Sequence, residues 1–107
     1  MAKRPPHRIE FAPAALDHSG AIDRKHYGLI ARTVSEQLSY TPNEETLNRK
    51  PLEVLAPFSS SWELRFGPDN CFRVFYDFVA QAHPVQVLAI GVKKGNRLYF
   101  GGKEFES

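Results

Sequence analysis

The second half of the sequence alternates between apolar and polar side chains, and this period of two restricts that part of the chain to β-strands with two unlike faces. The alternation runs through residues 62–66, 71–78 and 85–92, with turn-forming residues between these segments. A further segment at 98–100 follows the turn at 94–97 and is expected to pair as an edge strand. Strands connected in this way predict an antiparallel meander.

The first half of the sequence has a helical pattern instead. A short strand is expected at residues 7–11. Pro13 after it fits the first turn of a short helix, because backbone N–H groups in the first turn have no hydrogen-bond partner within the helix. A longer helix is expected over residues 21–39, because apolar residues recur there at helical spacing: Ile22, Tyr27, Ile30, Ala31, Val34 and Leu38. Residues 42–61 contain three prolines and predict an irregular connection, with one helical turn near 44–48.

The length of 107 residues predicts a single domain that spans residues 1–107. Two helices packed on one face of a meander give an α+β fold, in the order strand, helix, helix, antiparallel meander. Hydrophobic residues make up 42% and charged residues 24% of the chain, which excludes a disordered or collagen-like protein. The formal net charge of +2 permits an anionic partner without requiring one.

The composition also limits the class of site and the compartment. The only cysteine, Cys71, excludes an internal disulfide framework and is compatible with the reducing cytosol, and a cytoplasmic location is expected. The four histidines have no paired metal spacing, so no metal site is expected. No cofactor is expected either. No apolar run approaches the ~18 residues of a membrane span, so no membrane association is expected.

Alternation sorts the strand side chains into two faces. One face is apolar and is expected to pack against the helices; it carries Trp62, Leu64, Phe66, Phe72, Val74, Tyr76 and Phe78. The other face carries Arg65 and Arg73, with Lys93 at the end of the third strand, and such a basic surface is a suitable cradle for phosphate. The alternative is a solvated face on which Glu63 and Asp77 neutralise the arginines.

The position of Tyr99 depends on the length of the turn before it. A two-residue turn at Gly95–Asn96 pairs Val92 with Tyr99 and directs the phenol to the apolar face. A three-residue loop pairs Gly91 with Tyr99 instead and places the phenol beside the basic residues. The sequence leaves both registers open.

Five motifs follow one another along the chain: Arg49-Lys50-Pro51-Leu52, Trp62-Glu63-Leu64-Arg65, Phe72-Arg73-Val74-Phe75-Tyr76-Asp77, Val87-Leu88-Ala89-Ile90-Gly91 and Lys93-Lys94-Gly95-Asn96-Arg97-Leu98-Tyr99. In the order and spacing of these motifs the chain, from Arg8 to Phe105, resembles the RelE/ParE superfamily of toxins from type II toxin–antitoxin systems. The resemblance implies a strand–helix–helix–three-strand fold and a cytoplasmic toxin, of the kind linked to plasmid stabilisation. It also implies a cognate antitoxin protein as partner, with the ribosome and mRNA as further partners of a toxin that inhibits translation.

The resemblance implies roles for particular residues as well. The family's ribosome-dependent endoribonucleases cleave RNA through its 2′-OH without a metal, and they rely on arginines, lysines and a tyrosine. Matched by motif, the catalytic residues of this chain would be Arg73, Lys93 and Tyr99. The residues that would bind RNA phosphates are Arg49, Lys50, Arg65, Lys94 and Arg97.

The two lysines of the family's first meander strand correspond here to Ser61 and Glu63. This departure leaves three functions open. The first is an endoribonuclease toxin that acts on mRNA at the ribosome. The second is a ParE-like toxin that inhibits DNA gyrase, and the third is a non-catalytic member that uses the fold to bind proteins.

Overall fold

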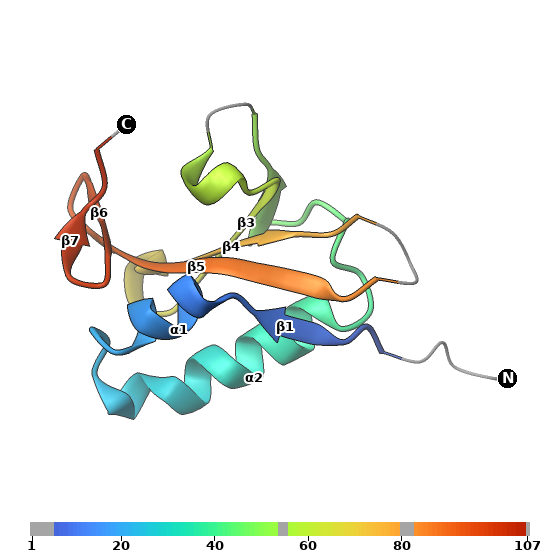
Figure 1. Cartoon of the computed structure of the whole chain (residues 1–107), viewed down its shortest axis with the longest axis horizontal. Helices are drawn as coiled ribbons and strands as arrows, with labels where there is room; N and C mark the ends of the chain where they lie inside the picture. Colours follow the sequence, from blue (N-terminus) through green and yellow to red (C-terminus); the bar gives the residue numbers. More distant parts are fainter. Residues whose placement is uncertain (1–5, 54–55, 80–82, 107) are drawn as a thin grey trace, which may run out of the picture.

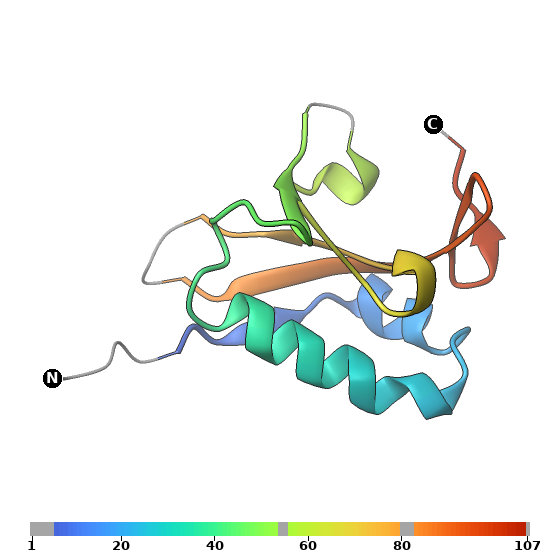
Figure 2. The same cartoon turned by 180° about the vertical axis from the view of Figure 1, so that it is seen from behind.

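The computed structural model describes residues 6–53, 56–79 and 83–106, and it has the expected α+β architecture. Its helices are α1 (Pro13–Ser19) and α2 (Tyr27–Leu38), and short 3₁₀ turns cover Arg24–His26, Pro57–Ser59 and Pro68–Asn70. Its strands are β1 (Ile9–Phe11), β2 (Arg49–Pro51), β3 (Trp62–Phe66), β4 (Phe72–Asp77), β5 (Val85–Lys94), β6 (Arg97–Phe100) and β7 (Lys103–Glu104). Both helices lie on the same side of the sheet, in the first view (Figure 1) and from behind (Figure 2).

The seven strands form one sheet in the order β2-β3-β4-β5-β6-β7, with β1 added beside β5. All neighbouring pairs are antiparallel except β1 and β5, which run parallel. The long strand β5 therefore has β4 along one edge and two partners along the other: β1 pairs with Val85–Val87, and β6 pairs with Gly91–Lys94. The expected meander of β3, β4 and β5 is confirmed, because these strands pair antiparallel in chain order.

The main core lies between the sheet and the two helices. Leu64, Val74 and Tyr76 from the sheet are fully buried, and they belong to the same apolar cluster as Val34 and Leu38 of α2. The remaining members include Ala15, Ile22, Ile30, Phe66, Phe72, Val85, Val87 and Ile90. The apolar face that alternation predicts is therefore the face that packs against the helices.

A second, smaller apolar cluster lies on the opposite face of the sheet. Phe75, Ala89 and Phe100 are buried there, and the partly buried side chains of Leu52, Leu98 and Phe105 pack against them. Gly91 makes this cluster possible, because a Cβ atom at this position would lie 2.8 Å from Cε1 of Phe100. The face opposite the helices is thus apolar in one part, and its basic residues occupy the rest.

The long helix is shorter than the apolar spacing predicts. It begins at Tyr27 rather than at residue 21, because the Asp23 side chain accepts a hydrogen bond from the Lys25 backbone N–H and caps a separate 3₁₀ turn at Arg24–His26. Asp at such a position accepts hydrogen bonds from backbone N–H groups, which in a longer helix would bond to carbonyls one turn earlier. The helix ends at Leu38, close to the predicted stop.

The helical turn expected near residues 44–48 is absent, and that expectation is wrong. The Thr46 hydroxyl instead accepts hydrogen bonds from the backbone N–H groups of Asn48 and Arg49, which gives the chain a local alternative to helix. The Asn48 side chain then donates to the Arg65 carbonyl. These contacts direct Arg49–Pro51 into the sheet as β2, a strand that the sequence pattern did not predict.

His18 closes a gap in the sheet. The backbone N–H of Ile90 lies between the β1-paired and β6-paired parts of β5, and it donates to Nδ1 of His18 at 3.2 Å. This hydrogen bond requires an unprotonated Nδ1. Burial lowers the pKa of His18 below its ordinary value, and the nearby Asp17 carboxylate offsets this shift in part.

The stability of the protein should consequently depend on pH through His18. Because its pKa is lowered in the folded protein, the contribution of His18 is complete above the ordinary histidine pKa, and it is lost as the pH falls through the folded-state value. We expect urea denaturation to show a falling free energy of unfolding below about pH 6.5. The His18→Asn variant keeps an acceptor near Nδ1 that does not titrate, so its pH dependence should be shallower. Equal slopes in both proteins would contradict this role.

Candidate nucleic-acid interface

Four basic residues from four adjacent strands share the face opposite the helices. They are Lys50 of β2, Arg65 of β3, Arg73 of β4 and Lys93 of β5, and we call them the cationic face. The register places Arg65 directly opposite Arg73, and Arg73 opposite Gly91, two residues before Lys93. Because side chains two residues apart on a strand point to the same face, Arg73 and Lys93 lie on one side of the sheet, as the sequence predicts.

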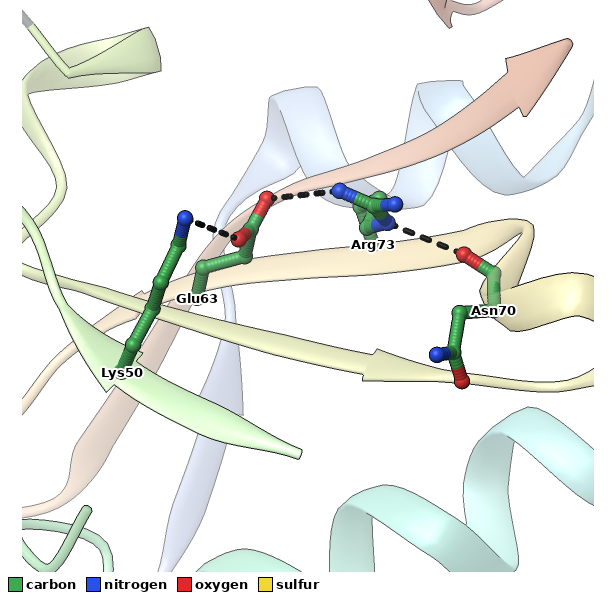
Figure 3. Close-up of polar contacts among 4 residues, drawn as sticks. All are labelled: Lys50, Glu63, Asn70 and Arg73. Carbon is green, nitrogen blue, oxygen red and sulfur yellow. Dashed lines mark hydrogen bonds and ion pairs between the residues drawn. The ribbon is translucent and has the colours of Figure 1, made fainter. Parts of the chain in front are cut away.

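The Glu63 carboxylate lies between two of these cations, Lys50 and Arg73 (Figure 3). Its Oε2 is 3.3 Å from Nη1 of Arg73, and its Oε1 is 3.6 Å from Nζ of Lys50. The Glu63 side chain is only 7% exposed, whereas that of Lys50 is 47% exposed. Arg73 also donates from Nε to the carbonyl of Asn70 at 2.9 Å, so two contacts fix its guanidinium.

The other carboxylate expected to neutralise the arginines does something else. Asp77 accepts hydrogen bonds from the backbone N–H and the hydroxyl of Ser61. The alternative prediction, that Glu63 and Asp77 both neutralise the arginines, is therefore confirmed for Glu63 and wrong for Asp77. Glu63 pairs with Arg73, whereas Asp77 binds Ser61 at the start of β3. The positive charge of the cationic face exceeds the negative charge that Glu63 supplies.

The pair of Arg65 and Arg73 is unfavourable by itself. Like charges directly opposite one another on neighbouring strands destabilise a sheet. Arg65 also has a buried Nε atom without a hydrogen-bond partner among the described residues. A phosphate bound between the two guanidinium groups would offset the repulsion between them, since guanidinium and phosphate form charge-assisted, bidentate hydrogen bonds.

Tyr99 does not join the cationic face. The turn after β5 has the two residues Gly95 and Asn96, so Val92 pairs with Tyr99 and Lys93 with Leu98. This register places the Tyr99 ring on the helix side of the sheet, where Nζ of Lys94 lies 5.5 Å from the ring centroid. The expected convergence of Arg73, Lys93 and Tyr99 at one site is therefore corrected, and proton transfer by Tyr99 at Arg73 is excluded by the geometry.

Lys94 and Arg97 also lie away from the cationic face. They pair with each other across the β5–β6 hairpin on the same side of the sheet as Tyr99. Arg97 forms an exposed ion pair with Glu104, in which Nη1 and Oε1 are 3.2 Å apart. Lys94 and Arg97 lie on this side because the length of the turn determines which face each residue of the hairpin occupies.

Arg49 is a structural residue rather than a phosphate-binding one. It pairs opposite Leu64, so it points to the helix side, and it is only 6% exposed. Its Nη1 donates to the carbonyls of Gln37 and Thr41 at the end of α2, where the helix dipole favours a cation. Neighbouring residues on a strand point to opposite faces. A strand predicted at this position would therefore have placed Arg49 and Lys50 on different sides of the sheet.

Tyr76 completes the buried polar contacts beside Arg49. Its hydroxyl donates to the carbonyl of Pro42 at 2.6 Å, and the side chain is fully buried. Burial raises the pKa of Tyr76 well above its ordinary value, and Arg49 opposes this shift only in part. Arg49 and Tyr76 thus attach the chain after α2 to the sheet, and neither faces a ligand on the cationic side.

The described residues contain no group of three His, Cys, Asp or Glu side chains that could hold a metal ion. Within the same parts of the chain, no helix has the length and hydropathy needed to cross a membrane. Comparison of the chain with models of protein families, with curated proteins and with solved structures finds no match.

Proposed function

We propose that this chain is a toxin of the RelE/ParE type that binds the phosphates of mRNA on its cationic face and thereby inhibits translation, as an endoribonuclease acting at the ribosome. The observation that carries the proposal is the cross-strand pair of Arg65 and Arg73, two like charges held side by side with one buried carboxylate nearby. Such an arrangement is costly in the free protein and favourable with an anion bound. The α+β architecture and the motifs quoted above support the proposal.

The chemistry of the face suits a nucleic-acid backbone. Glu63 and Asn70 hold the Arg73 guanidinium in place, and a fixed fork of donors can stabilise the charge that develops on a phosphate during cleavage. Lys93, exposed on the same face, is the remaining candidate of the three catalytic residues for a proton-transfer role beside Arg73. A site with so few groups would depend on RNA that the ribosome already holds in position.

A second function is favoured by the position of Tyr99. Because its phenol lies on the other side of the sheet, the cationic face has one group fewer for acid–base chemistry than the family resemblance implies. A non-catalytic member could use the same face to bind an acidic protein segment, such as the antitoxin. A ParE-like toxin would have the same expected fold. It would differ from the endoribonuclease and from the non-catalytic member in its target, DNA gyrase.

The first test measures RNA binding by the Arg65→Ala variant. Arg65 has an unpartnered Nε and faces a like charge, so its removal should leave the free energy of unfolding unchanged or higher. Affinity for a single-stranded RNA should fall roughly tenfold, and the salt dependence of binding should weaken by about one counterion. Arg32→Ala, an exposed arginine of α2, is the matched control and should bind RNA normally. Equal affinity of the wild type and Arg65→Ala would contradict the proposal.

Induced expression separates the three functions. A toxin that acts on translated mRNA should arrest growth and produce cleaved mRNA in ribosome fractions, and Arg73→Lys should relieve the arrest because lysine lacks the guanidinium fork. Arrest with DNA damage and intact mRNA would indicate a gyrase inhibitor. Normal growth with tight binding of an acidic antitoxin would indicate the non-catalytic member. Arrest that persists unchanged in Arg73→Lys at equal expression would remove the case for catalysis at this face.

A further inference from the structure

A hollow of about 460 Å³ lies at the end of the sheet, on the side of the helices. The segment between α1 and α2, the start of β4, the second half of β5 and the β6–β7 hairpin surround it. Figure 1 shows this hairpin and the α1–α2 link at the same end of the molecule. The volume falls within the roughly 300–1,000 Å³ typical of small-molecule sites.

The walls of the hollow combine flat rings with one cation and one anion. Tyr99 and Phe72 line it, and the His26 ring packs on Phe72 with centroids 5.1 Å apart. The ammonium group of Lys94 lies 5.5 Å from the Tyr99 ring centroid, and Asp23, whose Oδ1 accepts from the Lys25 backbone N–H, is a lining residue. Neither Tyr99 nor Lys94 contributes to the cationic face, so the proposed function does not account for their position.

The backbone of the β6–β7 turn leaves this hollow open. Gly101 and Gly102 line it and have φ angles of 60° and 81°, a region that glycine adopts without strain. At Gly101 the nearest side-chain atom to an added Cβ is Cδ2 of His18, at 3.6 Å. The turn therefore presents peptide groups rather than side chains to a ligand.

We propose that this hollow binds a nucleotide, with the base between the aromatic side chains and the phosphate at Lys94. Aromatic rings stack on bases, and a lysine ammonium is a suitable partner for a phosphate. The second oxygen of the Asp23 carboxylate, Oδ2, can accept a hydrogen bond from an N–H group of a base, since Oδ1 already accepts from the Lys25 backbone. No step of chemistry is assigned to the site.

Two sources could supply this nucleotide. Lys93 and Lys94 are adjacent but point to opposite sides of β5, so the cationic face and the hollow meet at the β5–β6 hairpin. An RNA strand on the cationic face could place one base in the hollow, and that source rests on the proposed function. A free nucleoside monophosphate could occupy the hollow without RNA.

The test uses the full chain labelled with ¹⁵N and titrated with AMP, GMP and inorganic phosphate. We expect both nucleotides to shift the amide resonances of Asp23, Gly101 and Gly102, and inorganic phosphate to bind much more weakly. Lys94→Gln should weaken nucleotide binding roughly tenfold, because it removes a charged hydrogen-bond donor. Tyr99→Leu should weaken it by a similar factor through lost stacking. Lys93→Gln is the matched variant and should change nucleotide affinity less than about twofold, while it weakens RNA binding at the cationic face.

The outcomes separate this inference from the proposed function. Nucleotide shifts confined to the cationic face, or phosphate binding as tight as that of AMP, would overturn the nucleotide site whatever RNA does. If a short single-stranded RNA shifts the resonances at both sites, the nucleotide comes from RNA. If only mononucleotides shift those of the hollow, it is a free nucleotide. Loss of RNA binding in Arg65→Ala with nucleotide binding intact would show that the two sites are independent.

Discussion

Replacing Glu63 with Gln should lower the free energy of unfolding by about 3 kcal/mol, because removing one partner of a buried ion pair leaves the other charge uncompensated. The variant keeps the size of the side chain and loses only its charge. Arg73, with a side chain 13% exposed, would then face Arg65 without a carboxylate beside it. Urea denaturation at neutral pH and low salt measures the difference from the wild type.

Phosphate should restore part of this loss. If the cationic face binds anions, an added polyphosphate takes the place of the Glu63 charge and stabilises the variant more than the wild type, since a ligand that binds only the folded state stabilises it. Glu104→Gln is the matched control, because Glu104 pairs with an arginine at the surface and its loss should change stability by less than about 1 kcal/mol. Equal stability of Glu63→Gln and Glu104→Gln would show that the buried pair contributes nothing.

The second large effect concerns the main core. Leu64 is fully buried between β2, β4 and the helices, so Leu64→Ala should lower the free energy of unfolding by about 2–5 kcal/mol through lost burial and a residual cavity. Leu47→Ala changes the same side chain at a position that is 94% exposed, and it should lower stability by less than about 0.5 kcal/mol. Chemical denaturation of the two variants measures both values. Similar losses in both would mean that the apolar face of β3 is not what holds the sheet to the helices.

Local patterns predicted the strands that carry the site. The alternation at residues 62–66 coincides with β3, and it gives the face of the sheet on which each residue of β3 and β4 lies. It does not give the burial of Glu63 and Phe75, which lie opposite the helices and are buried by the second apolar cluster and the ion pairs there. The reason is that the helix-facing side carries the main core, so a shift of register by one residue would move its apolar side chains to the opposite face. Arg65 and Arg73 could therefore be placed on one face without coordinates.

Long-range contacts decide the features that the sequence did not predict. Strand β2 has three residues, one of them a proline, so it is too short to show an alternating pattern. Its pairing with β3 is what brings Lys50 beside Glu63. Arg49 is buried because α2 ends above it, which no local rule indicates. The side of Tyr99 depended on one residue in a turn for which two lengths were compatible with the sequence.

The shared edge of β5 has a consequence for synthesis of the protein on the ribosome. Strand β1 pairs with Val85–Val87, and His18 accepts its hydrogen bond from the backbone N–H of Ile90, so neither contact can form before β5 has been made. Both β1 and α1 leave the ribosome long before their partner strand does, because the chain is made from its N-terminus at about 5–20 residues per second. The cationic face also lacks Lys93 until this last long strand has been made. A nascent chain that stops before residue 85 would therefore lack the strand that pairs with β1 and β4, and it would lack Lys93 of the cationic face.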